Sequence, residues 1–218
     1  MSGRIITVAQ QKGGSGKTTL AAHLAVALSQ RGPDGRRAQI AVLDCDPQGS
    51  LGEWFEAREA ALGENGTGLT FRTASGWGAR REARSLARDF DYVVIDTPPK
   101  SDVESRPAIE AADLVAVPVQ PTPIDLWATQ STLDMIAKEG TASLLVINRA
   151  QSRVALTQEI STAIAALGHP AALTRLGNRV GYAASMGHGL TVLETGPGSK
   201  GALEIEALAA EFRRHLGG

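Results

Sequence analysis

The 218-residue chain is poor in cysteine, lysine and aromatic residues. Its single cysteine, Cys45, excludes an intramolecular disulfide and any zinc or iron–sulfur site that needs several cysteines of one chain. Aromatic residues make up only 4% of the sequence, so the core must be largely aliphatic. No apolar run approaches the roughly 18 residues of a transmembrane helix, and the early apolar run Ile5–Ala9 is too short for a signal peptide.

The charge balance excludes a protein whose whole surface attracts nucleic acid. The chain has 22 Lys and Arg against 23 Asp and Glu, a net charge of −1, so any basic surface must be local. With 43% hydrophobic and 21% charged residues, the composition is that of a globular protein. We expect one domain over residues 1–218, cytoplasmic in setting.

Short β-branched runs alternate with helical patterns, which predicts βαβ units. We therefore expect an α/β fold: a twisted, mainly parallel sheet with helices on both faces. The predicted strands are Ile5–Gln10, Gln39–Asp44, Thr70–Thr73, Tyr92–Asp96, Leu114–Val119, Leu144–Asn148 and Ala172–Arg175. The predicted helices are Thr18–Gln30, Leu51–Ala61, Ala79–Arg88, Ala128–Lys138, Thr157–Leu167 and Ala202–Leu216.

A glycine-rich segment joins the first predicted strand to the first predicted helix. Glycines in this context let successive backbone N–H groups point at an anion, and the helix N-terminus adds a favourable dipole. Lys17 can then reach the β- and γ-phosphates of a nucleotide, and the Thr18 hydroxyl can ligate Mg²⁺. The segment, a predicted phosphate-binding loop, reads Gln11-Lys12-Gly13-Gly14-Ser15-Gly16-Lys17-Thr18-Thr19.

Two features distinguish this loop from the commonest phosphate loop. Gln11 stands where the pattern G-x-x-x-x-G-K has its first glycine, and Lys12 adds a second lysine. With the pattern K-G-G-x-G-K-[ST], the loop resembles that of the deviant Walker ATPases, which include ParA-type partition ATPases, MinD-type division regulators and the nitrogenase iron protein. The resemblance implies a P-loop NTPase fold in which Lys12 reaches across a dimer to the other subunit's ATP. The alternative is a solvated lysine beside the site.

Aspartates stand at the carboxyl ends of two of the predicted strands. Side chains alternate along a strand, so Asp44 and Asp46 should leave on one side, roughly 7 Å apart. Asp96 ends its own strand at the carboxyl edge, where open α/β sheets bind ligands. An apolar strand that ends in one aspartate is a common Mg²⁺ site. We therefore predict that Thr18 and Asp96 bind Mg²⁺.

The residue after Asp96 is a threonine, whereas many P-loop ATPases have there a glutamate that positions the attacking water. Asp46 is therefore the best candidate for that role, its alternative being a helix N-cap. The resemblance agrees, because the family's D-x-D-P segment orients the water with its second aspartate, and its first, here Asp44, contacts Mg²⁺ through water. We expect a slow ATPase with ATP and Mg²⁺ as cofactors and Lys12, Lys17 and Asp46 as catalytic residues.

Later segments extend the resemblance over nearly the whole chain. Asn148 ends a predicted strand where the family often places a base-contacting side chain, and capping of the strand end is the alternative. Asp125 lies in Pro118–Asp125, a segment that the family places near the base and the dimer contact. A helix N-cap is the alternative for Asp125.

The resemblance implies a ParA-type switch: ATP closes a homodimer, the dimer binds non-specific DNA, and hydrolysis releases it. A plasmid, a chromosome or a protein cluster would be the cargo, with a ParB-type or other adaptor as activator and the nucleoid as location. Scattered arginines are usually solvated, but a dimer could gather them into a stripe for DNA phosphates. The candidates are Arg149, Arg153, Arg175, Arg179, Lys200, Arg213 and Arg214.

Three other functions are weighed against this one. A MinD-type membrane switch needs a cationic amphipathic C-terminal helix, but Glu204, Glu206 and Glu211 offset the arginines of the last helix. We thus expect no stable membrane association. An electron-transfer protein of the iron-protein type needs more than one cysteine. A dethiobiotin-synthetase-like ligase on the same fold is disfavoured by Lys12.

Overall fold

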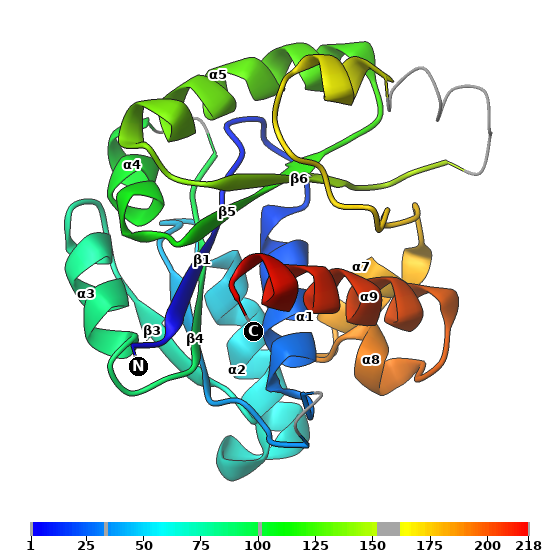
Figure 1. Cartoon of the computed structure of the whole chain (residues 1–218). Helices are drawn as coiled ribbons and strands as arrows, with labels where there is room; N and C mark the ends of the chain where they lie inside the picture. The colour runs from blue at the N-terminus through cyan, green and yellow to red at the C-terminus, as the bar shows by residue number, and fades with distance from the viewer. Residues whose placement is uncertain (1, 33–34, 100–101, 152–161, 218) are drawn as a thin grey trace.

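The computed structural model describes residues 2–32, 35–99, 102–151 and 162–217 (Figure 1). The strands are β1 Arg4–Val8, β2 Ile40–Asp44, β3 Thr70–Thr73, β4 Tyr92–Asp96, β5 Leu114–Val119 and β6 Ser143–Ile147. The helices are α1 Lys17–Ser29, α2 Ser50–Leu62, η1 Glu64–Gly66, α3 Gly78–Leu86, α4 Asp102–Ala111, α5 Pro123–Glu139, α7 Val180–Met186, α8 Val192–Thr195 and α9 Lys200–His215. The strands form one all-parallel sheet in the order β3-β2-β4-β1-β5-β6, which confirms the predicted fold class.

The register of the central strands places three strand ends side by side. Asp96 of β4 pairs with Val8 of β1 on one side and with Asp44 of β2 on the other. The loop that follows β1 therefore lies at the same edge of the sheet as the two aspartates. This edge is the carboxyl end of the parallel strands, where ligands bind in open α/β sheets.

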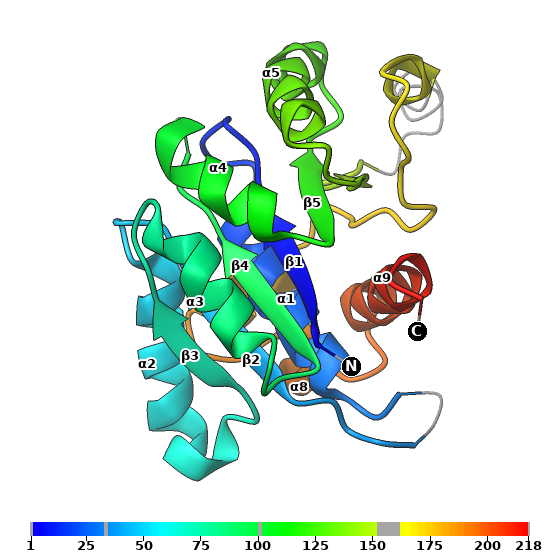
Figure 2. The same ribbon diagram turned by 60° about the vertical axis from the view of Figure 1, so that its left-hand side comes forward.

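Helices cover both faces of the sheet because successive side chains of each central strand point to opposite faces, and both faces are apolar. In β4, Val94 packs into a core with α1, α2, α8 and α9, whereas Val93 and Ile95 pack into a core with α3 and α4. In Figure 2, α3 and α9 lie on opposite sides of the central strands. A third core joins α5 to β5 and β6. Burial on both faces explains why the central strands read as continuous apolar runs.

Helix α1 is buried on more than one side over most of its length, whereas the sequence predicted a single apolar face from Leu20, Leu24 and Leu28. It lies between the sheet and α9, and Phe212 of α9 is fully buried in the same core. The apolar side of α9 is therefore used inside the protein. Within the described residues, every helix is too short or too polar to cross a bilayer.

The predicted seventh strand, Ala172–Arg175, is wrong. Bridges flank this segment at Ala171 and Gly177, but it does not form a continuous ladder with β6. The backbone N–H groups of Leu173 and Thr174 instead donate to the carboxylate of Glu211, each at 2.8 Å. A side chain of α9 thus takes the hydrogen bonds that a further strand would need.

Three described α-helices, α4, α7 and α8, and the short 3₁₀-helix η1 are additional to the predicted helices. Helix α5 begins at Pro123 rather than Ala128, because Pro123 occupies the first turn and Thr122 caps it by accepting from Asp125 N at 3.2 Å. Of the predicted helix Thr157–Leu167, residues 162–166 are helical and 157–161 lie outside the described residues.

Candidate functional site

The glycine-rich loop between β1 and α1 adopts conformations that require glycine. Gly14 and Gly16 have φ angles of 73° and 92°, which side chains disfavour. A Cβ atom on Gly16 would also lie 2.4 Å from Nδ2 of Asn148. Gly16 forms the N-cap of α1, so the loop runs directly into the helix N-terminus. This is the geometry that favours a bound anion.

Two side chains hold the loop from outside through its carbonyl oxygens. Gln120 Nε2 donates to Gly14 O at 2.8 Å, and Asn148 Nδ2 donates to Ser15 O at 2.9 Å. In a trans peptide the next N–H points the opposite way, so the N–H groups of Ser15 and Gly16 are directed away from these anchors. The loop is thereby arranged to offer N–H donors on its other side.

Both ends of the Asn148 amide are hydrogen-bonded, one to the loop and the other to the neighbouring backbone. Besides donating to Ser15, it accepts from Arg149 N through Oδ1 at 2.9 Å, and only 8% of the residue is exposed. A contact between Asn148 and a nucleotide base stays a prediction.

The cation and carboxylate behind the loop are both buried. Lys17 is 7% exposed, and burial lowers its pKa while Asp96 and then Asp46 act to raise it. Asp96 is 1% exposed, and burial with the nearby Asp44 raises its pKa to about 7, although the hydrogen bond from Thr18 and the charge of Lys17 oppose this. Thr18 Oγ1 donates to Asp96 Oδ2 at 2.6 Å. The structure thus brings together the residue pair predicted to bind Mg²⁺.

Two buried side-chain oxygens lack a hydrogen-bond partner in the described part of the chain, and both lie in this site. They are Ser15 Oγ and Asp96 Oδ1. Buried polar atoms are normally satisfied, so these atoms fit a site that is completed by a phosphate and a cation. Among the described residues no group of three or more histidine, cysteine or acidic side chains is placed to hold a metal.

The two aspartates at the end of β2 differ in environment. Asp44 is buried, accepts from Asp46 N at 2.9 Å and from Gly52 N at 3.1 Å, and has a pKa raised by burial. It thereby fixes the turn into α2. Asp46 accepts from Gln48 N at 3.0 Å and lies partly open on a cavity. The N-cap of α2 is Gly49, so Asp46 does not cap that helix.

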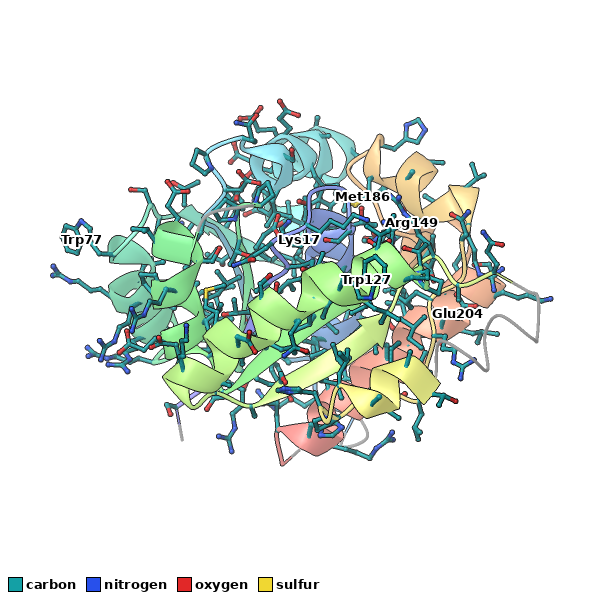
Figure 3. The ribbon with its side chains drawn as sticks, turned by 90° about the horizontal axis from the view of Figure 1, so that it is seen from above. Lys17, Trp77, Trp127, Arg149, Met186 and Glu204 are labelled. Atoms are coloured by element: carbon teal, nitrogen blue, oxygen red, sulfur yellow. The ribbon has the colours of Figure 1, made fainter. Side chains whose placement is uncertain are left out.

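The cavity in front of the loop has a volume of about 640 Å³, within the usual range for a small-molecule site. Lys17, Thr18 and Asp46 lie on its wall, as do Arg149 and Met186. Figure 3 shows Lys17, Arg149 and Met186 on the same part of the molecule. Arg149 has a φ of 54°, a strained backbone for a side chain of this size, and such strain often marks functional positions. The sequence pattern had suggested Arg149 only as a DNA contact, and its unusual φ could not be read from the sequence.

Lys12 does not point freely into solvent. Its Nζ lies 2.5 Å from Oδ1 of Asp125, in the first turn of α5, and the lysine side chain is 33% exposed. Thr122 Oγ1 also donates to the Asp125 carboxylate. Asp125 therefore belongs to the capped start of α5 and also neutralises Lys12 within one chain.

Two of the arginines predicted to contact DNA are engaged within the chain. Arg179 forms an ion pair with Glu204, and Arg213 donates to Ala27 O and Leu28 O near the end of α1, at 3.0 and 3.2 Å. Arg153 lies outside the described residues.

Comparison with known proteins gives consistent matches. The profile of the family described as "CobQ/CobB/MinD/ParA nucleotide binding domain" matches residues 6–214. The maintenance of carboxysome distribution protein A of Halothiobacillus neapolitanus is 31% identical over 216 residues, which cover 94% of each chain. The ATP complex of McdA from Cyanothece has a TM-score of 0.74 at 19% identity and covers 99% of this chain and 97% of that one. MinD of Pyrococcus horikoshii with Mg-ADP has a TM-score of 0.78 at 20% identity, with 98% and 97% covered.

Proposed function

The chain belongs to the CobQ/CobB/MinD/ParA family of nucleotide-binding domains, and from this premise we propose that it is an ATP-dependent dimerisation switch of the ParA type. The observation that carries the proposal is the pair of lysines in one phosphate loop. Lys17 is buried behind the loop, whereas Lys12 lies at its outer edge, held by Asp125. One lysine is placed for the nucleotide of its own chain, and the other is available to a second chain.

ATP and Mg²⁺ are the ligands that this site fits. The N–H groups of the loop and Lys17 bind the phosphates, and Thr18 with Asp96 holds Mg²⁺, which would neutralise phosphate charge. Phosphoryl transfer needs mainly positioning and charge stabilisation. Asp46, on the cavity wall, orients the attacking water, while Asp44, which fixes the turn into α2, would contact the metal through water. Arg149 borders the part of the cavity left for the nucleoside.

In the proposed dimer, Lys12 leaves Asp125 for the γ-phosphate bound by the other chain. An exposed apolar surface beside this ion pair supports a second chain there: Ile124 and Trp127 of α5 are 65% and 75% exposed. Exposed apolar groups next to a site often mark an interface. Hydrolysis then depends on dimerisation, so turnover by the single chain is slow.

The switch positions a cargo. The ATP-bound dimer binds DNA without reading sequence and is thereby associated with the nucleoid, and hydrolysis, stimulated by a ParB-type or other adaptor, releases it. The relative from Halothiobacillus neapolitanus is named for carboxysome distribution, which supports a protein cluster as cargo alongside plasmids and chromosomes. A MinD-type membrane role is less well supported, because the apolar side of α9 is buried against α1.

The proposal is tested by size-exclusion chromatography of the Asp46→Ala protein with ATP and with ADP, followed by DNA binding on each peak. We expect a dimer with ATP that binds random-sequence DNA, and a monomer with ADP that binds weakly. A protein that binds ATP with Mg²⁺ but stays monomeric would contradict the proposed switch.

A further inference from the structure

Helix α3 presents a row of arginines that none of the preceding functions uses. Arg81, Arg84 and Arg88 are exposed and follow each other at spacings of three and four residues, so they lie along one side of the helix and the turn after it. Trp77, four residues before Arg81, is 84% exposed. Figure 3 shows Trp77 at the rim of the molecule, away from Lys17. The row therefore lies outside the nucleotide cavity.

These side chains line a hollow of about 490 Å³ along the helix. Within the described part of the chain its lining holds four guanidinium groups and no carboxylate, although an adjoining hollow adds Glu82. Arg80 is paired with Glu110 of α4 at 2.7 Å, but no ion pair to the three arginines of the row is seen among the described residues. The lining consists of Trp77, Arg80, Arg81, Arg84, Ser85 and Arg88.

The composition of this hollow favours a phosphate backbone over a protein partner. Guanidinium groups match phosphate oxygens with two parallel hydrogen bonds. Protein–protein interfaces are enriched in arginine and tryptophan but have little net charge at their cores, whereas protein–DNA interfaces are much more positively charged. Four guanidinium groups without a carboxylate in the lining therefore fit phosphates better. A membrane surface would need more exposed apolar area than Trp77 alone supplies. Since the net charge of the whole chain is −1, the row is a local concentration of positive charge.

We propose that the groove along α3, defined by Trp77, Arg81, Arg84 and Arg88, is the surface that binds the DNA backbone. This inference rests on the proposed function and places its DNA contact. The DNA contact is thereby assigned to the exposed arginines of α3 and not to the arginines in the C-terminal part of the chain. Two of the latter, Arg179 and Arg213, are engaged within the chain.

The groove also accounts for the dependence of DNA binding on dimerisation. Each phosphate contact adds about −0.9 to the slope of log K against log salt concentration. Three arginines give one chain a slope of about −3, and a dimer with two grooves on one DNA gives about −6. One groove binds weakly at physiological salt, and two joined grooves bind far more tightly because the second contact is intramolecular.

The test compares two triple variants with the wild type by fluorescence anisotropy on a random-sequence DNA duplex, with Mg²⁺ and a non-hydrolysable ATP analogue, over a range of salt. One variant carries Arg81→Gln, Arg84→Gln and Arg88→Gln. The control carries Arg37→Gln, Arg72→Gln and Lys138→Gln, which remove the same charge from exposed positions that are not among the candidate DNA contacts. Both must hydrolyse ATP and dimerise as the wild type does.

The α3 variant lacks the arginines of both grooves of the dimer. We expect it to lose at least roughly tenfold in affinity and to flatten the salt slope by about 5, while the control changes little. An α3 variant that binds DNA like the wild type would overturn this inference but leave the proposed function intact. A wild-type dimer that ignores DNA at low salt would overturn the DNA part of the proposed function as well. Wild-type binding to poly-glutamate or to anionic vesicles, lost in the α3 variant without any DNA binding, would assign the groove to an acidic protein or to a membrane.

Discussion

Three ionisable residues of the nucleotide site are buried by the protein chain itself. Asp96, Asp44 and Lys17 are 1%, 3% and 7% exposed. An isolated buried charge is unfavourable unless it is paired or hydrogen-bonded, and burial accordingly raises the pKa of both aspartates and lowers that of Lys17. A bound phosphate and cation would favour the charged forms of these groups. The motif predicted these residues. It could not predict that Asn148 points at the loop, because the direction of a strand-end side chain depends on the loop packed against it.

Asp46 and Glu53 are two acidic side chains on the wall of the same cavity, and we expect only one of them to matter for hydrolysis. Asp46→Ala should bind ATP and dimerise, yet hydrolyse it roughly a hundredfold more slowly or worse, because the attacking water loses its orienting group. Glu53→Ala should behave like the wild type. Single-turnover hydrolysis at saturating ATP is the measurement. Slow hydrolysis by Glu53→Ala together with wild-type hydrolysis by Asp46→Ala would show that Glu53 orients the attacking water.

His23 makes stability depend on pH. The ring is fully buried, with Nδ1 2.8 Å from Thr19 O, and Nε2 accepts from Val192 N at 3.2 Å. Burial lowers its pKa from 6.5 to about 4, so the unfolded chain takes up a proton before the folded chain does. The contribution of His23 to the free energy of unfolding is therefore complete above pH 6.5 and is lost as the pH falls toward 4. The total loss is about 3 kcal/mol.

Urea unfolding at several pH values between 6.5 and about 4 measures this effect. His23→Gln should be less stable at neutral pH but should lose about 3 kcal/mol less on acidification. His215→Gln, at an exposed position of α9, is the control and should follow the wild type. Equal acid sensitivity of the wild type and His23→Gln would show that other groups cause it.

Among the elements, continuous apolar runs were the most reliable guide. The apolar strands Tyr92–Asp96 and Leu114–Val119 were predicted with the bounds that the structure shows, as was Thr70–Thr73, which is not an apolar run. Helix α4 was missed because Pro107 lies inside it, and prolines usually interrupt helices. The seventh strand was predicted wrongly because Glu211, far away in sequence, supplies the competing acceptor. Local pattern cannot reveal such long-range partners.

Glu211 fastens the 173–174 backbone to α9. Its carboxylate accepts from two backbone N–H groups and from the Thr174 hydroxyl, and the residue is only 5% exposed. Glu211→Gln should lower the free energy of unfolding by about 2 kcal/mol, because one acceptor oxygen is replaced by a donor that faces an N–H group. Glu206→Gln, exposed on the same helix, should change it little. Urea denaturation checks both, and equal stabilities would contradict this role.

In the proposed switch, we expect the Lys12–Asp125 ion pair to set how readily a single chain enters the dimer. Asp125 competes with phosphate for Lys12, so we expect the Asp125→Asn protein to dimerise with ATP at a roughly five- to tenfold lower concentration. The reason is that the two ion pairs, one in each chain, no longer have to break when the dimer forms. Asp134→Asn, exposed on the same helix, is the control. Analytical ultracentrifugation gives the dissociation constants. Weaker dimerisation of Asp125→Asn would mean that Asp125 acts in the closed dimer.

For the whole molecule, the sheet places everything needed to bind a nucleotide at one edge, but one chain holds its Lys12 away from its own Lys17 site. The sequence pattern and the resemblance led to this arrangement. They could not show that Asp125 holds Lys12 or that Ile124 and Trp127 lie exposed beside it, because these are consequences of how α5 packs. The central claim is that Lys12 acts on the nucleotide of a second chain.

Mixing two inactive variants tests this claim most directly. Lys12→Ala lacks the lysine that acts across the dimer, and Asp46→Ala lacks the water-orienting group. In a mixed dimer, the intact Asp46 of the Lys12→Ala chain faces the intact Lys12 of the other chain. An equal mixture should therefore recover about a quarter of wild-type ATP hydrolysis, because half of the dimers are mixed and each has one complete site. An equal mixture that forms dimers with ATP but stays inactive would contradict the claim.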